Sequence, residues 1–310
     1  MRILRFTPLL LTLLSPAVWG QDFVRMPRAL QARWQCSLTA RAGWQQPGYS
    51  SRAWSRPAVV PGRYPLSMEP ASQALYSFVW HPRGASTGKP VYFRRMVTLT
   101  GQPVEATISA CADDQFALSV NGVGVGASSA PHEFGSFDAL KYFKHGANVV
   151  AVEAKDVRPT GYGLLVAPEI TQTWPLQPCD WYCSTNGRSH WRKAITDTAP
   201  PIALQGLKPY KCITAPGGMK DFSTAYFRRT LALDGLPLEA TAVVLADDSY
   251  ELYVNGRLVT LEKRLERSYI PRKANLMPFL HPGQNTVVVK VTNDWGPGRM
   301  YCVPTVTMTF

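Results

Sequence analysis

Short segments in which apolar and polar residues alternate, separated by turn residues, follow one another along most of the chain. In YELYVNG, residues 250–256, Leu252 and Val254 alternate with more polar positions before the dipeptide Asn255-Gly256. A period of two is typical of a half-buried strand, and Asn-Gly is a strong signal for a hairpin. No stretch longer than about 12 residues keeps a clean period of 3.6. The pattern therefore predicts an all-β protein with few helices.

The same pattern occurs twice. The segment VYFRRMVTLTGQPVEATISACADDQFALSVNG at 91–122 aligns with AYFRRTLALDGLPLEATAVVLADDSYELYVNG at 225–256, and Asn148 later aligns with Asn285. Internal repeats of this kind decide the architecture of a chain. We therefore predict two copies of one domain, at residues 21–172 and 173–310, with the boundary inside TQTWPLQP, residues 171–178.

The repeated motifs resemble a known family. A Tyr-Phe-Arg-Arg strand, the motif ATxxxxADDxxxLxVNG and a later GxNxVxV are similar to galactose-binding-like jelly-roll domains, including the accessory carbohydrate-binding domains of bacterial rhamnosidases and other glycoside hydrolases. The resemblance covers residues 75–168 and 222–310. It implies two tandem β-sandwiches that bind sugars, stabilise neighbouring catalytic domains or act as spacers. Because one fold carries many functions, the site has to be argued from its own residues.

Residues 1–20 have the features of a secretory signal peptide. Arg2 and Arg5 precede an apolar run at 9–14, and small residues stand before Gln21. The apolar run is too short to span a bilayer, and no later window approaches about 20 apolar residues. We expect a secreted, periplasmic or cell-surface protein without a transmembrane segment.

Six cysteines lie beyond this leader. An even number in an exported chain favours disulfides over metal thiolates. Cys36 with Cys111 is the simplest pairing in the first half, and the connectivity of the others stays open: Cys179, Cys183, Cys212 and Cys302. CDWYC with nearby His190 could be half of a zinc site, but no second ligand pair follows at zinc spacing.

Composition and charge narrow the class of partner. The 26 prolines and 23 glycines agree with a turn-rich fold, and the formal net charge is +12. A positive excess attracts acidic polymers, so an acidic polysaccharide is the favoured partner. The basic run at 257–273 is interpreted as a solvated loop, and nucleic-acid binding is not favoured. No nucleophile elbow, zinc-protease motif or phosphate-binding loop is present.

Paired carboxylates are the first candidate site residues. Asp113 and Asp114 precede the first hairpin, and Asp247 and Asp248 precede the second. Glycoside hydrolysis uses two carboxyl groups roughly 5–10 Å apart, whereas side chains of adjacent strand residues point to opposite faces. A catalytic pair is therefore disfavoured. The remaining interpretations are a turn cap, an acceptor for a sugar hydroxyl, or a ligand of a structural calcium ion; no other cofactor is expected.

The second candidate is the loop after the last long strand of each copy, where the copies differ. The second copy has Asn293, Asp294, Trp295 and Arg299, and the first has Asp156, Arg158 and Tyr162. An aromatic ring beside amide, carboxylate and guanidinium groups suits a sugar, and binding residues often lie on such loops. The alternative is that Trp295 fills the end of the core.

Three functions stay open. The first is an exported, non-catalytic, lectin-like protein that binds a cell-envelope or extracellular polysaccharide. The second is a structural subunit of a surface appendage or envelope complex, with protein partners and no sugar binding. The third, a small glycoside hydrolase or esterase, is least favoured, because no catalytic domain remains once the two repeats are removed.

Overall fold

A computed structural model describes residues 33–60, 77–84, 87–158, 161–199, 202, 210–263 and 270–310. The predicted signal peptide, residues 1–20, lies outside these ranges. In the described ranges, helical structure is confined to short 3-10 turns. None of them is long and apolar enough to cross a bilayer.

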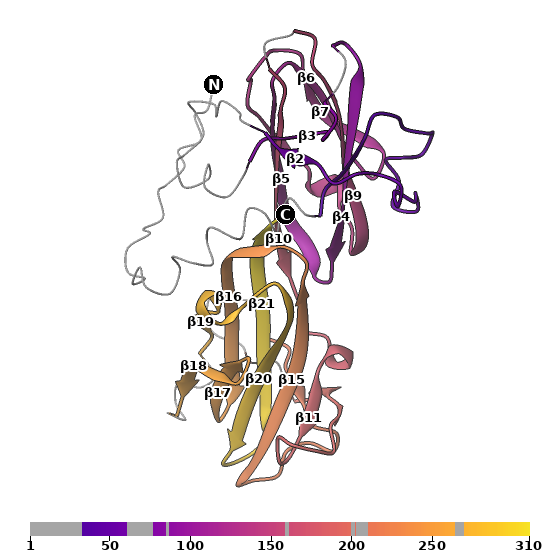
Figure 1. Ribbon diagram of the computed structural model, residues 1–310. Helices are drawn as coiled ribbons and strands as arrows, with labels where there is room; N and C mark the ends of the chain where they lie inside the picture. Colours follow the sequence, from indigo (N-terminus) through magenta and orange to yellow (C-terminus); the bar gives the residue numbers. More distant parts are fainter. Residues whose placement is uncertain are drawn as a thin grey trace.

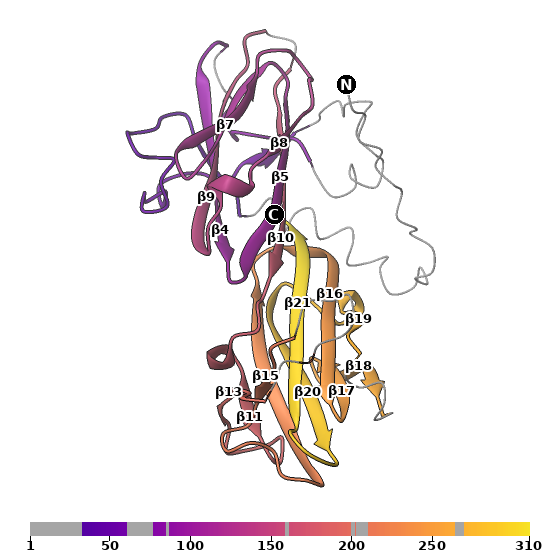
Figure 2. The ribbon, with the colours of Figure 1, turned by 180° about the vertical axis from the view of Figure 1, so that it is seen from behind.

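The first half of the chain forms a β-sandwich (Figure 1). Its elements are β1 (Gln35–Ser37), β2 (Ala58–Val59), β3 (Val79–Trp80), β4 (Pro90–Leu99), β5 (Gln102–Ala112), β6 (Gln115–Val120), β7 (Val123–Ser128), β8 (Gly135–Asp138), η1 (Leu140–Tyr142), β9 (Gly146–Lys155) and β10 (Leu164–Thr173). One layer has the order β1-β4-β9-β6-β7, and the facing layer contains β2, β3, β10, β5 and β8. Seen from behind, β8 lies along β5 at the edge of the second layer (Figure 2).

The second half repeats this order of elements. It consists of η2 (Pro178–Asp180), β11 (Tyr182–Ser184), β12 (Arg192–Lys193), β13 (Ile195–Thr196), β14 (Ile213–Thr214), β15 (Ser223–Leu233), β16 (Leu236–Asp247), β17 (Ser249–Val254), β18 (Arg257–Glu262), β19 (Arg272–Asn275), η3 (Met277–Phe279), β20 (Gly283–Asn293) and β21 (Arg299–Thr309). The layer β12-β11-β15-β20-β17-β18 corresponds to the β1 layer. It faces β13, β14, β21, β16 and β19.

Alternation along the strands builds the core of each sandwich. On β4, Val91 and Phe93 point inward and are fully buried, and on β15 Phe227 and Leu231 do the same. Because side chains alternate between the two faces of a strand, each strand gives one apolar face to the core. The predicted all-β sandwich class is confirmed.

The two Asn-Gly hairpin turns have the predicted geometry. The φ angles are 52° and 81° at Asn121 and Gly122, and 51° and 78° at Asn255 and Gly256. A type I′ turn needs positive φ at both central residues, which Asn and Gly tolerate. The asparagines therefore have a structural role in both halves.

A second, buried asparagine fixes each of these turns. The Asn255 side-chain amide donates to Oδ1 of Asn285 at 2.9 Å. Oδ1 of Asn285 also accepts from the backbone N–H of His281 at 3.0 Å, and the Asn285 amide donates to the His281 carbonyl at 2.7 Å. Asn121 and Asn148 make the equivalent bond in the first half, also at 2.9 Å. Each hairpin is thus tied to the start of β9 or β20.

The halves are joined by direct strand pairing. The last five residues of β10, 169–173, pair antiparallel with residues 305–309 of β21, so that one sheet runs through both sandwiches. Thr171 lies opposite Thr307, with their hydroxyl oxygens 2.9 Å apart. The predicted domain boundary between residues 172 and 173 falls inside this pairing.

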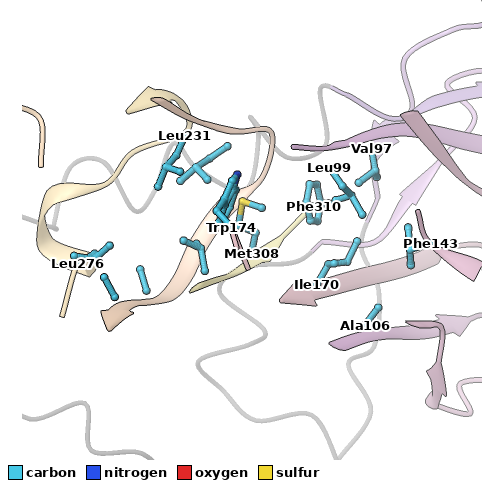
Figure 3. Close-up of a cluster of buried hydrophobic side chains, with 14 of the residues drawn as sticks. Val97, Leu99, Ala106, Phe143, Ile170, Trp174, Leu231, Leu276, Met308 and Phe310 are labelled. Carbon is cyan, nitrogen blue, oxygen red and sulfur yellow. The ribbon is translucent and has the colours of Figure 1, made fainter. Parts of the chain in front are cut away.

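The pairing is approximately symmetric about the Thr171–Thr307 pair. The backbone N–H of Trp174 donates to the carbonyl of Pro304 at 3.0 Å, and that of Phe310 donates to the carbonyl of Pro168 at 3.1 Å. The aromatic side chains that follow the two strands enter the core between the halves (Figure 3). One hydrophobic cluster therefore extends from the first sandwich into the second.

The predicted disulfides are wrong, because all six cysteines are free thiols. Cys36 points into the core between the sheets, whereas Cys111 points to the other face of its sheet, against Phe78 and Leu165. A sheet therefore separates the two cysteines predicted to pair, and a disulfide needs Cβ atoms about 4 Å apart.

The other four cysteines are also placed apart. Cys183 and Cys302 lie in the main core, Cys212 lies against Leu245 on the outer face of the shared sheet, and Cys179 is exposed. Burial raises the pKa of the Cys212 and Cys302 thiols to about 12. Buried, protonated thiols of this kind are chemically inert.

Candidate functional site

The candidate loops lie at opposite ends of the molecule. β10 and β21 both finish at the junction, so the start of β21 and the loop before it, residues 294–298, lie at the far end of the second half (Figure 1). The equivalent loop of the first half, after β9, lies at the other extreme. A short ligand therefore contacts one loop or the other, and cannot bridge the two.

The second aspartate of each pair anchors its loop. Oδ2 of Asp248 accepts from the consecutive backbone N–H groups of residues 294 and 295, at 2.6 and 3.0 Å. Oδ2 of Asp114 accepts from residues 157 and 158, at 2.7 and 2.9 Å. The same turn-capping contact thus recurs in both halves, and both carboxylates are occupied by their own loops.

The Asp114 contact sets a pH-dependent part of the stability. Burial by itself raises the pKa of Asp114, but the backbone N–H groups of Val157 and Arg158 and the Arg158 guanidinium outweigh it and lower the pKa. A lowered folded-state pKa stabilises the protein above the unfolded-state value of about 4, and this contribution is lost as the pH falls through the folded-state pKa.

We therefore expect Asp114→Asn to lower the free energy of unfolding by about 2 kcal/mol at pH 7, because an uncharged amide with one acceptor oxygen cannot replace both carboxylate oxygens, which bind the backbone N–H groups and the Arg158 guanidinium. The difference from wild type should shrink below about pH 4, where the unfolded chain takes up a proton at Asp114 before the folded protein does. Urea unfolding at pH 7 and at pH 3 measures both values. A difference that is the same at the two pH values would contradict the assignment.

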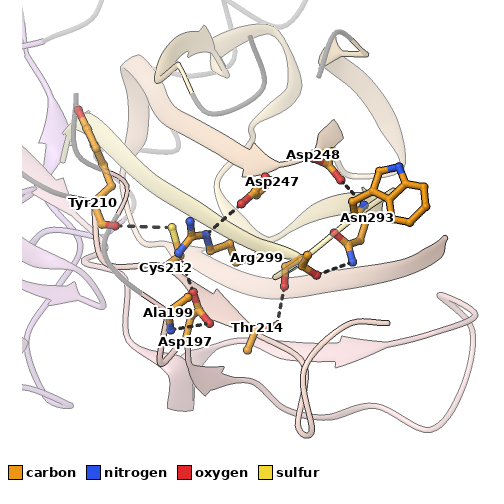
Figure 4. Close-up of polar contacts among 12 residues, drawn as sticks. Asp197, Ala199, Tyr210, Cys212, Thr214, Asp247, Asp248, Asn293 and Arg299 are labelled. Atoms are coloured by element: carbon orange, nitrogen blue, oxygen red, sulfur yellow. Dashed lines mark hydrogen bonds and ion pairs between the residues drawn. The ribbon is translucent and has the colours of Figure 1, made fainter. Parts of the chain in front are cut away.

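The first aspartate of each pair has a different partner in each half. Oδ2 of Asp247 accepts from Nε of Arg299 at 3.3 Å, and Arg299 also pairs with Asp197 at 3.1 Å (Figure 4). Burial raises the pKa of Asp247, and the Arg299 charge opposes this. In the first half, Asp113 pairs with His132 at 2.9 Å. The sequence did not indicate Asp197 or His132.

Arg299 therefore has a structural role and is mostly withdrawn from solvent. Its side chain is 12% exposed, and that of Asp197 is 9% exposed. Two carboxylates around one guanidinium satisfy its charge inside the protein. The structure places Arg299 beneath the loop that carries Trp295, where it holds β21 against the segment around Asp197.

Trp295 projects into solvent together with a second aromatic residue, Phe222. They are 65% and 70% exposed, and their rings meet edge to face with centroids 4.6 Å apart. The interpretation that Trp295 fills the end of the core is therefore wrong. Phe222 was not predicted, because it lies in the loop before β15 and the repeat does not mark it. The aligned residue of the first half is Gly88, which has no side chain.

Buried polar groups hold the loops beneath this aromatic pair. The fully buried Asn293 side chain donates to the carbonyls of Lys220 and Gly296, both at 3.0 Å. Asp221 accepts from the backbone N–H of Gly296 at 3.0 Å. These bonds tie the Phe222 loop to the Trp295 loop, so both rings stand on one cross-linked base.

A small groove opens in the same two loops. It has a volume of about 290 Å³, and its walls include residues 195–198, Thr214, 217–219 and 297–298. Thr214 donates from its hydroxyl to the carbonyl of Gly298 at 2.6 Å. The aromatic pair therefore stands beside a groove lined mainly by small and polar residues.

In the equivalent loop of the first half, the described residues, 156–158 and 161–163, include no exposed aromatic pair. Asp156 is buried, and burial, together with Asp114 nearby, raises its pKa. Arg158, which aligns with Trp295, pairs with Asp114 at 2.6 Å. Tyr162 is 43% exposed, and its ring stacks on that of Trp80 with the ring centroids 5.8 Å apart. The two loops have thus diverged on a common scaffold.

The candidate carboxylates do not assemble a metal centre. Within the described residues, no three His, Cys, Asp or Glu side chains form a group that could hold a metal ion. Oδ2 of Asp114 and Oδ2 of Asp248 accept from backbone N–H groups, and Oδ2 of Asp247 pairs with a guanidinium.

No family model matches the chain. Its sequence is 31% identical over 139 residues to an alpha-L-rhamnosidase of Streptomyces avermitilis. The match covers 42% of this chain and 14% of the rhamnosidase. The matched part of this chain therefore corresponds to a small part of that enzyme.

The comparison with solved structures gives similarities with low TM-scores, of which three are described here. The Streptomyces avermitilis rhamnosidase complexed with L-rhamnose has a TM-score of 0.29 and 17% identity, over 75% of this chain and 26% of that one. A Pleurotus ostreatus lectin in complex with GalNAc has a TM-score of 0.27 and 22% identity, and the match covers 71% of this chain and 74% of the lectin. A Bacteroides uniformis beta-glucuronidase has a TM-score of 0.31 and 11% identity, and the match covers 85% of this chain and 27% of the glucuronidase.

These TM-scores are too low to carry over a site or an activity. The sequence match to the rhamnosidase agrees with the resemblance drawn from the repeated motifs, and the all-β fold is the one that this resemblance implies. The chain is thus similar to galactose-binding-like jelly-roll domains of the kind that accompany glycoside hydrolases.

Proposed function

We propose that the chain is an exported, non-catalytic carbohydrate-binding protein, and that its second half binds a sugar over the Trp295–Phe222 pair. The observation that carries this proposal is the exposure of two large aromatic rings, 65% and 70%, on a loop base cross-linked by buried hydrogen bonds. Exposed apolar groups on an ordered base are typical of binding sites.

The chemistry of the pair suits a sugar. An aromatic face packs on the C–H groups of a pyranose ring and removes both apolar surfaces from water. The adjoining groove presents Thr196, Thr198 and backbone groups of the glycine-rich loop, which can exchange hydrogen bonds with hydroxyls. Because the loop bonds are made before the ligand arrives, binding need not order the loops.

A catalytic role is less well supported. Asp247 is held by Arg299, and Asp248 by two backbone N–H groups, so both carboxylates are committed to structural contacts. A general acid or nucleophile has to reach the substrate. The leader at residues 1–20 supports export, and the net charge of +12 favours an acidic envelope or extracellular glycan.

We expect Trp295→Ala to weaken glycan binding by about 10- to 100-fold, because it removes an aromatic side chain whose burial is worth about 1.5–3 kcal/mol. Phe222→Ala should weaken binding by a smaller factor, since Phe222 supports the indole edge to face. A glycan array identifies a ligand for the wild type, and calorimetry of the full chain measures the affinities.

Val59→Ala is the matched control. Val59 is 57% exposed in the first half, so this change removes exposed apolar surface away from the loops. It should leave binding unchanged. If no neutral or acidic glycan binds the wild type, while native extracts yield a stoichiometric protein partner that Trp295→Ala releases, the chain is a structural subunit and the proposal fails.

A further inference from the structure

The outer face of the β4 layer differs from the equivalent face of the second half. In the first half, the segment between β1 and β2 folds over this face, and Trp44 packs on Val149 and Ala151. Trp44 also meets Tyr92 edge to face at 5.1 Å. The first half thus covers its own sheet with an aromatic loop.

An arginine at the centre of this face shows the consequence. In the first half, Arg94 is 1% exposed and donates to the carbonyls of Tyr49 and Gln46 and to the Ser51 hydroxyl, at 3.0, 3.1 and 2.6 Å. The covering loop therefore supplies acceptors for both terminal nitrogens of this guanidinium, while its buried Nε makes no hydrogen bond.

For Arg228, the aligned arginine of the second half, the part of the chain that the structure describes provides no such acceptors. The loop between β11 and β12 is short, and from it only the indole of Trp191 reaches the guanidinium, with the Arg228 Cζ atom 4.1 Å from the ring centroid. Among the described residues, no hydrogen-bond or ion-pair partner is found for the Arg228 side chain. A partly exposed guanidinium is thus positioned by an aromatic ring and keeps its donors available.

Arg228 lines a pocket of about 640 Å³ at the junction of the halves. The first half contributes Thr100 and His145, and the second contributes Tyr182, Thr230, Gln284 and Thr286. Tyr182 is 41% exposed and pairs across the strands with Arg228. Hydroxyl, amide and phenol groups therefore line the same pocket as the guanidinium.

The charge of the pocket is set by Arg228. Asp180, the acidic residue of the lining, is bound by Arg229 at 2.8 Å. Arg229 is also held by the carbonyls of Trp174 and Pro175, at 3.3 and 2.9 Å. With Asp180 neutralised, the pocket presents a net positive group to solvent.

We infer that this junction pocket binds an acidic sugar of a glycan through its carboxylate. The planar guanidinium fork of Arg228 matches a carboxylate in two parallel hydrogen bonds, and Trp191 holds the fork in place. Thr230, Gln284 and Thr286 offer hydrogen bonds to sugar hydroxyls. The inference rests on the proposed carbohydrate binding for its ligand class, but it concerns a different site at the other end of the second half.

The test uses the full chain carrying Trp295→Ala and Phe222→Ala, so that the loop site does not contribute. Calorimetry with a galacturonic acid trimer should detect binding, and a neutral galactose trimer should bind at least about tenfold more weakly. Adding Arg228→Met should weaken binding of the acidic trimer by about tenfold or more, as expected for the loss of a charge-assisted bond.

Two further variants separate the pocket from general charge and from folding. Arg52→Met removes one exposed positive charge in the first half and should leave binding unchanged. Thr286→Glu keeps Arg228 but adds a carboxylate to the pocket wall, and it should abolish binding of the acidic trimer. Circular dichroism melting curves confirm that each variant is folded.

The outcomes distinguish this inference from the proposed function. Unchanged acidic-trimer binding in Arg228→Met and Thr286→Glu would overturn the junction site, even where Trp295→Ala alone removes binding to an array glycan. Equal weakening for acidic and neutral trimers would overturn the carboxylate role. If the chain carrying Trp295→Ala and Phe222→Ala no longer binds the acidic trimer, the trimer binds at the Trp295 loop and the junction site is overturned.

Discussion

Asn285→Ala is expected to lower the free energy of unfolding by about 3–4 kcal/mol. Asn285 is fully buried and joins four hydrogen bonds, at 2.7 to 3.1 Å, with His281, Gly283 and the hairpin residue Asn255. Each buried partner left without a bond costs about 1–3 kcal/mol, reduced where water reaches it. Urea denaturation followed by tryptophan fluorescence measures the loss.

The first half supplies a matched test of the same network. Asn148→Ala removes the equivalent bonds with Lys144, Gly146 and Asn121, and it should cost a similar amount. Asn275→Ala is the control, because Asn275 is exposed and accepts one local bond from Met277 at 3.0 Å. A loss for Asn285→Ala no larger than that for Asn275→Ala would show that the turn network does not support the fold.

Gly235→Ala is expected to destabilise the junction by about 3 kcal/mol. A Cβ atom at Gly235 would press directly on the backbone carbonyl oxygen of Thr309 and lie 3.0 Å from the Phe310 ring. Backbone cannot move aside as a flexible side chain does, so the end of β21 has to shift from its pairing with β10. Thermal unfolding, together with hydrogen exchange of the 305–309 amides, measures both effects.

Gly101→Ala tests the symmetric position. Its Cβ atom would lie 2.8 Å from the Trp174 ring and 2.9 Å from the Thr173 carbonyl oxygen. Gly124→Ala is the control, because nothing lies within 4 Å of its Cβ position. If Gly235→Ala and Gly124→Ala leave equal stability and equal exchange rates, close approach at the junction does not hold the halves together.

The junction also decides how the two candidate sites relate to each other. Strand pairing and a continuous core fix the halves, with the Trp295 loop at one extreme of the molecule and the Arg228 pocket at its middle. Two weak sites on one rigid chain raise the apparent affinity only for a polymer long enough to reach both. A long acidic polysaccharide is therefore expected to bind more tightly than a trimer.

Local pattern was sufficient for the strands, the turns and the repeat. The alternation around Leu252 and the Asn255-Gly256 dipeptide act within a few residues, so the hairpin and its positive φ angles could be predicted without tertiary contacts. Asp248 was expected to cap a turn next to its own strand, but its carboxylate accepts from residues 294 and 295, which lie 46 and 47 residues further along the chain, so local pattern did not indicate this contact.

Other features depended on long-range packing and were missed or predicted wrongly. The even cysteine count favoured disulfides, but Cys36 and Cys111 lie on opposite sides of a sheet, which spacing along the chain does not reveal. Phe222 lies 73 residues before Trp295 in the sequence, and only the meeting of their two loops makes an aromatic pair.

The amino-acid sequence by itself determined an all-β chain with a doubled motif, because alternation and turn chemistry are local and are read directly from neighbouring residues. The tertiary structure alone decided that the copies share a sheet through Thr171 and Thr307, that Arg299 is mostly buried between two carboxylates, and that Arg228 is left open. These outcomes depend on which surfaces meet, and the same Arg-Arg motif therefore gives a covered arginine in one half and an available one in the other.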